Sequence, residues 1–186
     1  MSDSKQIVRL HEGPVFDVDL IRWTGRGGVP VEKIAVRHRG AVAVVPVLDD
    51  GRLVLIRNHR ATLEDWLVEF CAGGIAAGEP AIEAASRELA EETGYTAGAI
   101  EPLGSFFTAP GFSDELMQVF VAGALSLGER RLEPDERIEV EVCAPDDLAA
   151  RIATGEVRDG KTIAAFHLWR SKGEPRPMRT SRGSDR

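Results

Sequence analysis

Residues Gly73 to Tyr95 read GGIAAGEPAIEAASRELAEETGY, and this stretch decides the fold prediction. Pro80 suits the first turn of a helix, because its missing N–H has no partner there in any case. Gly94 suits the end of the helix, where glycine adopts the left-handed conformation easily. Apolar residues recur between them at helical spacing and are expected to face a core: Ile82, Ala85 and Leu89. The stretch therefore predicts a glycine-rich loop followed by a helix.

Three glutamates crowd this helix within five residues: Glu88, Glu91 and Glu92. Glu88 and Glu92 lie one turn apart at about 100° per residue, so their like charges repel by a few tenths of a kcal/mol. A solvated acidic face is the plainer interpretation of any Glu-rich helix. The outlying Glu79 and the lone Arg87 form a larger pattern than charge alone requires. A divalent cation explains the cluster better, since hard ions such as Mg²⁺ prefer carboxylate oxygens.

The skeleton Gly-x5-Glu-x7-Arg-Glu-Leu-x-Glu-Glu-x-Gly, running from Gly73 to Gly94, resembles the Nudix box. Every fixed position of that motif matches, and Tyr95 stands where the motif prefers an aliphatic residue. The likeness extends more weakly over residues 35–172. It implies the Nudix fold, an α/β architecture in which a mixed β-sheet is sandwiched between helices and the box forms a loop–helix–loop.

The same resemblance implies a metal centre that holds Mg²⁺ or Mn²⁺ through box carboxylates and one backbone carbonyl: Glu88, Glu91, Glu92 and Ala72. Such ions would offset the charge of a pyrophosphate and lower the pKa of the water that attacks phosphorus. Arg87 is expected to orient the site by forking onto Glu79 or a box carboxylate. Three box residues are therefore expected to take part in catalysis: Glu79, Arg87 and Glu91.

The general base is expected on a loop after the box, where the related ADP-ribose pyrophosphatases often carry a glutamate. Here the loop before the strand predicted at residues 138–142 reads LEPDERIEV. Glu136 best matches that position, and Glu139 is second. A mobile loop would fit a base that arrives only with substrate. The alternative is that both residues are simply solvated.

Substrate contacts are suggested by three further segments. Residues 109–115 read APGFSDE, close to the SPGFSDE context of the ADP-ribose pyrophosphatase subgroup, so Pro110 and Glu115 are expected at the substrate. A plain Pro-Gly turn is the alternative. Residues 57–60 resemble the subgroup's VRQYR stretch, so Arg57 or Arg60 is expected to meet phosphate or adenine. Residues 69–73, EFCAG, replace the usual ELPAG, and loss of that proline predicts a less rigid loop.

The activity that the resemblance implies is hydrolysis of the pyrophosphate bond of a nucleoside diphosphate sugar, foremost ADP-ribose to AMP and ribose 5-phosphate. Another nucleoside diphosphate derivative, such as GDP-mannose, is one alternative substrate. A non-catalytic regulator that binds nucleotide sugars is the other alternative. The intact set of three glutamates argues against a regulator, because a binding module need not keep metal-ligand spacing.

The chain of 186 residues suits one domain with a small extension. Residues 14–38 predict a strand pair within an N-terminal β extension, residues 1–39. By the resemblance, such an arm crosses over in a homodimer whose protomers share substrate sites. Residues 40–170 are expected to be the Nudix hydrolase domain. The polar, basic residues 171–186 are expected to be a disordered tail.

Apolar runs inside the domain predict the remaining elements. Residues 40–48, GAVAVVPVL, predict a buried strand ending in a tight turn, with residues 53–57 as its hairpin partner. Further strands are predicted in three places: 66–71, 117–122 and 138–142. Helices are predicted at 145–153 and 161–170.

Composition narrows the partners and the compartment. A net charge of −7 argues against nucleic acid, whose phosphates need a basic surface. No apolar run is long enough to span a bilayer, and the first residues lack the apolar core of a signal peptide. Cys71 and Cys143 are isolated, which favours free thiols. These features predict a cytoplasmic protein.

Overall fold

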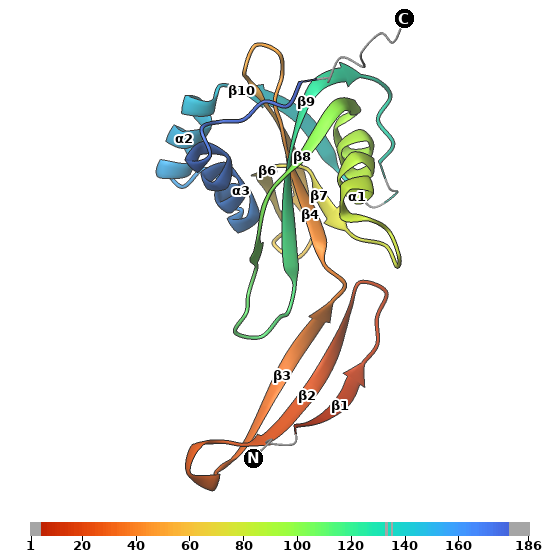
Figure 1. The fold of residues 1–186 in the computed structure, drawn as a ribbon, viewed down its shortest axis with the longest axis vertical. Coiled ribbons are helices and arrows are strands. Elements are labelled where there is room, and N and C mark those ends of the chain that lie inside the picture. Colours follow the sequence, from red (N-terminus) through yellow and green to blue (C-terminus); the bar gives the residue numbers. More distant parts are fainter. Residues whose placement is uncertain (1–4, 133, 135, 179–186) are drawn as a thin grey trace, which may run out of the picture.

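The computed structural model describes residues 5–132, 134 and 136–178. Figure 1 shows two parts, an elongated arm of N-terminal strands and a larger body that carries the helices. Among the described residues, no helix is long and apolar enough to cross a membrane.

The arm is a three-stranded antiparallel sheet in the order β1-β2-β3. Its strands are β1 (Gln6–His11), β2 (Phe16–Thr24) and β3 (Pro30–His38). Gly27 and Gly28 turn the chain between β2 and β3 at φ of 76° and 81°, a conformation that favours glycine. The sequence predicted only β2 and β3. The first strand was missed because most of its residues are exposed, which leaves no clear apolar face.

The body holds a four-stranded mixed sheet in the order β7-β4-β9-β8 and a three-stranded sheet in the order β10-β5-β6. The strands of the first sheet are β4 (Ala41–Pro46), β7 (Ala72–Gly74), β8 (Tyr95–Phe107) and β9 (Leu116–Leu127). Those of the second are β5 (Leu53–Arg60), β6 (Asp65–Glu69) and β10 (Ile138–Cys143). Parallel pairing of β4 with β9 makes the first sheet mixed, as predicted.

Strand β4 lies at the centre of the body and is buried on both faces. Ala43 and Val45 face a core shared with helices α2 (Pro145–Ala153) and α3 (Gly160–Ser171). Val42 and Val44 face a second core beneath helix α1 (Ala81–Glu88). In Figure 1, α1 covers one side of the sheet and α2 with α3 the other. This confirms the predicted α/β sandwich and explains the unbroken apolar run at residues 41–47.

The predicted hairpin between residues 40–48 and 53–57 is wrong. Gly51 makes the expected tight turn at φ of 86°, but only the single bridge Val47–Leu53 links the two segments. Both edges of β4 are already occupied by β7 and β9. Strand β5 therefore pairs with β6 and β10 in the second sheet.

The box helix begins after Pro80, continues beyond α1 as a π-helical turn (Leu89–Thr93) and ends at Gly94, whose φ is 77°. Ala85 and Leu89 are buried as predicted, but Ile82 is 43% exposed. Ala84 is the buried residue of that turn. The buried face therefore lies further round the helix than the apolar spacing indicated.

Part of the expected tail packs on the body. The Trp169 indole donates a hydrogen bond to the Pro175 carbonyl oxygen at 2.9 Å. Pro177 is buried, and its carbonyl lies where a side chain on Gly123 would stand. The tail prediction therefore does not hold for residues 171–178, whereas residues 179–186 lie outside the described residues.

Candidate active site

A pocket of about 510 Å³ opens between the box helix and the hairpin of β5 and β6. The strands contribute residues 58–62 and 72–74 to its lining. The box helix and the loop before β10 contribute acidic and basic side chains: Arg87, Glu88, Glu91, Glu92 and Glu136. The fold thus brings together most of the residues that the sequence proposed for metal binding and catalysis.

Glu88 and Glu92 form the buried acidic part of this pocket, with exposed fractions of 8% and 3%. The Ala72 backbone N–H donates to Glu92 Oε2 at 2.9 Å. A Cβ atom on Gly73 would overlap the Glu88 carboxylate, so glycine is required there. Burial, together with the negative charges of Glu88 and Glu136, raises the pKa of Glu92 to about 8. Burial raises the pKa of Glu88 as well.

Arg87 holds the box together through a fork of hydrogen bonds. Its Nε donates to Glu79 Oε1 at 2.9 Å, and its Nη2 donates to the Gly74 carbonyl at 3.0 Å. Its Nη1 donates to Glu88 Oε1 at 2.7 Å and to Glu91 Oε2 at 3.1 Å. Arg87 therefore ties the loop before the helix to two of the expected metal ligands.

The chemistry of this acidic set fits a divalent cation. Burial raises the pKa values of Glu88 and Glu92 even though Arg87 pairs with Glu88, and a hard cation would supply further countercharge that favours the ionised carboxylates. Among the described residues, no three acidic, His or Cys side chains already converge as a ligand set. Arg87 is paired with the carboxylates of Glu88 and Glu91.

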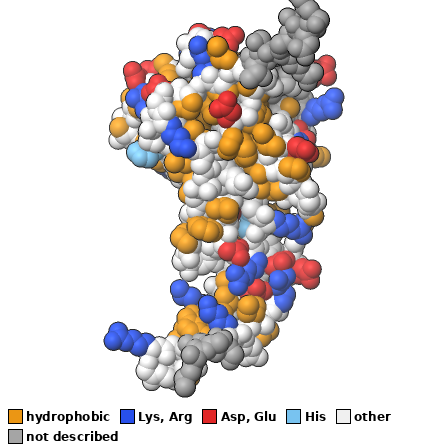
Figure 2. Space-filling model, viewed as in Figure 1, with side chains coloured by type: hydrophobic (Ala, Val, Ile, Leu, Met, Phe, Trp, Pro, Cys, Tyr) orange, Lys and Arg blue, Asp and Glu red, His pale blue; other side chains and the backbone are white. Residues whose placement is uncertain are grey.

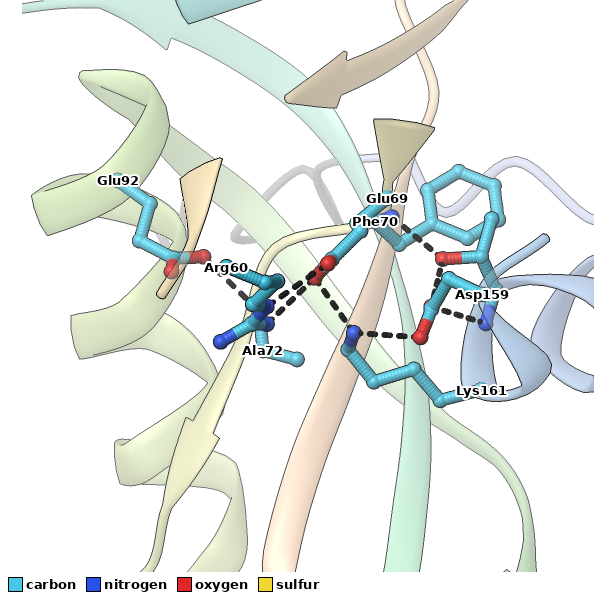
Figure 3. A network of polar contacts seen from close by, with 8 residues as sticks. Arg60, Glu69, Phe70, Ala72, Glu92, Asp159 and Lys161 are labelled. Carbon is cyan, nitrogen blue, oxygen red and sulfur yellow. Dashed lines mark hydrogen bonds and ion pairs between the residues drawn. The ribbon is translucent and has the colours of Figure 1, made fainter. Parts of the chain in front are cut away.

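Arg60 also lines the pocket and is anchored by Glu69, which is fully buried. Arg60 donates from Nε to Glu69 Oε1 at 2.8 Å and from Nη2 to Glu69 Oε2 at 2.5 Å. Lys161, from α3, donates to Glu69 Oε2 at 2.5 Å (Figure 3). The contact between Glu69 and Lys161 was not predictable from sequence, because no local pattern links a strand end to a helix 92 residues later.

Glu136 and Glu139, the two candidates for the base, separate in the structure. Glu136 lines the pocket, whereas Glu139 pairs with Arg57 at 2.9 Å and is exposed. The Arg57 guanidinium also lies 5.4 Å from the centroid of the Trp66 ring. Neither Arg57 nor Glu139 is among the residues that line the pocket, in contrast to Arg60.

Pro110 and Glu115 are not among the residues that line the box pocket. Pro110 lines a second pocket, of about 360 Å³, against Trp23 and Lys33 of the arm. Glu115 accepts a hydrogen bond from the Thr108 hydroxyl at 2.6 Å. The structure does not bring these two residues to the expected metal ligands.

The loop of residues 109–115 instead fastens the arm to the body. The Val36 N–H donates to the Phe112 carbonyl at 2.7 Å, and the Asp114 carboxylate accepts from the His38 N–H and from Arg37, each at 2.9 Å. Arg37 also binds Asp19 of β2 at 2.9 Å. On the face shown in Figure 2, acidic and basic side chains gather over the arm near this junction.

Comparison with known proteins agrees with the fold. The model of the NUDIX domain matches residues 37–166, so the chain belongs to the Nudix family. The chain is 37% identical to the ADP-ribose pyrophosphatase of Bacillus subtilis (strain 168), over 88% of this chain and 90% of that protein. It is 36% identical to the methanol dehydrogenase activator of Bacillus methanolicus, over 87% of this chain and 84% of that protein.

Among solved structures, the chain resembles an ADP compounds hydrolase with a TM-score of 0.77. The match covers 94% of this chain and 98% of the other, at 23% identity. At that identity the likeness speaks for the fold alone, and it confirms the predicted Nudix fold.

Proposed function

We propose that the protein is a metal-dependent hydrolase of nucleoside diphosphate sugars, with ADP-ribose as its principal substrate and AMP and ribose 5-phosphate as products. The observation that carries this proposal is the pair of buried carboxyl groups, Glu88 and Glu92, at one side of a pocket of about 510 Å³. A pocket of this size suits a small molecule such as a nucleotide sugar.

The residues of the pocket have three proposed roles: metal binding, orientation of the carboxylates and proton transfer. Glu88, Glu91, Glu92 and the Ala72 carbonyl oxygen would hold Mg²⁺, or Mn²⁺, which supplies countercharge to the diphosphate and lowers the pKa of a bound water. Arg87 keeps the carboxylates in reach of one another through its fork to Glu79. Glu136, at the pocket wall, takes the proton of the attacking water as general base.

The substrate side of the pocket is basic. Arg60 presents a guanidinium at the pocket wall, and its charge suits the diphosphate. The choice of ADP-ribose rests on the APGFSDE segment and on the relative from B. subtilis. Relatives of similar identity, 37% and 36%, carry different names, so sequence identity by itself does not fix the substrate.

We further propose that two copies form a homodimer through the arms. The arm exposes apolar side chains, with exposed fractions of 45–59% for Ile7, Leu10, Phe16 and Ile34, and apolar surface of this kind is typical of interfaces. A partner protomer would also explain why Pro110 and Glu115 lie away from the pocket of their own protomer. Light scattering coupled to size-exclusion chromatography should give twice the mass of one chain. The mass of a monomer would contradict the proposal.

We also propose a cytoplasmic location and a small-molecule substrate. The buried free thiol of Cys71 supports a cytoplasmic location. The net charge of −7 supports a small-molecule substrate, held through bound cations, over nucleic acid.

The decisive experiment is hydrolysis of ADP-ribose, ADP-glucose, GDP-mannose and UDP-glucose, each with Mg²⁺ and with EDTA. We expect EDTA-sensitive release of AMP, fastest from ADP-ribose. Faster turnover of GDP-mannose would assign the alternative substrate. Nucleotide-sugar binding without any turnover would overturn the enzymatic proposal in favour of a regulator.

A further inference from the structure

A buried network of polar side chains connects helix α3 with the basic wall of the pocket. In Figure 3, Arg60 lies between Glu92 of the box helix and Glu69, and Lys161 of α3 approaches Glu69 from the far side. Both Glu69 oxygens accept from Arg60, and Oε2 also accepts from Lys161. Lys161 in turn lies 3.0 Å from Asp159 Oδ1. Four side chains of alternating charge therefore form a row that ends at the pocket: Asp159, Lys161, Glu69 and Arg60.

The charged side chains of this row are largely removed from water, so each needs a partner of opposite charge. Glu69 has no exposed surface, and a carboxylate removed from water is destabilising unless strong partners replace its hydration. The Lys161 side chain is 14% exposed, whereas the Arg60 side chain keeps 39% of its surface. Lys161 contacts Glu69 and does not line the pocket, whereas Arg60 contacts Glu69 and lines the pocket.

The fork to Glu69 fixes the plane of the Arg60 guanidinium. Nε and Nη2 are both used by Glu69, which leaves Nη1 without a hydrogen-bond partner among the described residues. A guanidinium held by two parallel bonds has a defined direction for its remaining donors. Glu69 thereby sets which donors of Arg60 are available to a ligand in the pocket.

The backbone next to Glu69 is held from the same two sides. The Phe70 N–H donates to the Thr162 hydroxyl at 2.9 Å, and that hydroxyl donates to Asp159 Oδ2 at 2.6 Å. Two residues on, the Ala72 N–H donates to Glu92. The segment that lacks the usual proline is thus held by side chains from α3 and from the box helix.

We propose that Lys161 is a positioning residue of the active site, which acts through Glu69 to hold Arg60 in the orientation that binds the substrate diphosphate. This inference rests on the proposed function, because Arg60 must contact a diphosphate for its orientation to matter. Lys161 itself does not touch substrate. A purely structural role, in which the network only fastens α3 to the end of β6, is the competing explanation.

The two explanations differ in a double-mutant cycle on the full-length protein. Lys161→Met should raise the KM for ADP-ribose about tenfold and change kcat little, since loss of diphosphate binding in ground and transition states alike is felt in KM. In an Arg60→Ala background, the same Lys161→Met change should have almost no further effect on KM. Lys161→Arg, which keeps the charge, should restore most of the binding.

Arg158→Met is the matched control. It removes a cation three residues before Lys161, where Arg158 pairs with exposed Asp65 at 2.7 Å and does not contact Glu69. Its KM should equal that of the unmodified protein. If Lys161→Met fails to fold by circular dichroism, Lys161→Gln keeps a hydrogen-bond donor for Glu69 and replaces it in the cycle.

Two results would overturn the inference: an equal rise of KM in both backgrounds, or no effect of Arg60→Ala by itself. If the unmodified protein hydrolyses no ADP-ribose, the proposed function fails, and the cycle is run on the Kd of ADP with Mg²⁺ by calorimetry. The same non-additivity in Kd would then support the positioning of Arg60 separately. Absence of ADP binding would overturn it.

Discussion

Glu92 is an acidic side chain that the fold buries almost completely, although burial of a charge is destabilising. One of its oxygens accepts the Ala72 N–H, and its nearest acidic neighbours, Glu88 and Glu136, oppose its ionisation. Burial and the neighbouring negative charges destabilise the ionised Glu92 carboxylate. A bound cation would offset both, because its positive charge favours the ionised form. Strongly perturbed carboxyl groups in a pocket are typical of functional sites.

Glu92→Gln should therefore remove activity without unfolding the protein. The amide has the size of the carboxyl group and can still accept from Ala72, but it is a poor ligand for Mg²⁺. We expect kcat to fall by about 10³-fold or more. Circular dichroism should report an unchanged fold. Activity near that of the unmodified protein would contradict the assignment of Glu92 to the metal centre.

The same side chain predicts how stability depends on pH in the metal-free protein. Since its pKa is about 8 in the folded state and about 4.5 in the unfolded state, the folded state keeps a proton that the unfolded state loses. Stability should therefore fall as the pH rises from about 4.5 to about 8, by a few kcal/mol at most. Glu79 and Asp19, whose arginine partners lower their pKa values, act at more acidic pH.

Thermal denaturation in EDTA across this range is the measurement. Saturating Mg²⁺ should flatten the profile, because a cation favours the ionised carboxylate. Glu92→Gln should flatten it without metal. A profile that stays flat for the unmodified protein in EDTA would show that Glu92 ionises as easily in the folded state as in the unfolded state.

At the scale of elements, the box helix and strand β7 approach so closely that one position admits no side chain. Gly73→Ala should displace the Glu88 carboxylate, because the added Cβ would overlap it. We expect activity to fall by about 10²-fold, since small displacements of catalytic groups are costly. Gly74→Ala is the matched control on the same strand, because a Cβ there meets nothing within 4 Å. Equal losses in both variants would contradict the role given to Gly73.

The elements also show what a sequence can and cannot predict. The box helix, β4, α2 and α3 were predictable because their periodicity or end signals are local. Strand β8 was missed, since Gly98, Pro102 and Gly104 weaken its β pattern and it bulges between Pro102 and Gly104. The pairing of β5 and the contact of Lys161 with Glu69 depend on which distant segments meet. Such contacts produce no local sequence pattern from which they could be predicted.

At the scale of the whole molecule, the separation of the 109–115 loop from the box pocket bears on the proposed homodimer. Pro110 and Glu115 lie at the junction of arm and body, where Asp114 binds Arg37 and the His38 N–H. The 109–115 loop is therefore bound to the arm as well as to the body. In a homodimer joined by the arms, the loop of one protomer can face the pocket of the other, and each active site would be shared.

A shared site predicts that two defective variants restore each other. Glu92→Gln damages the box pocket, and Glu115→Gln damages the loop. If each site combines the pocket of one protomer with the loop of its partner, a mixed dimer has one site with both defects and one intact site. Random reassortment of equal amounts should then recover about one quarter of the unmodified activity, because half of the dimers are mixed. If Glu115 serves the pocket of its own protomer, every site in the mixture carries one defect, and mixing recovers nothing. Turnover of ADP-ribose before and after mixing, with each variant alone as control, separates these two architectures.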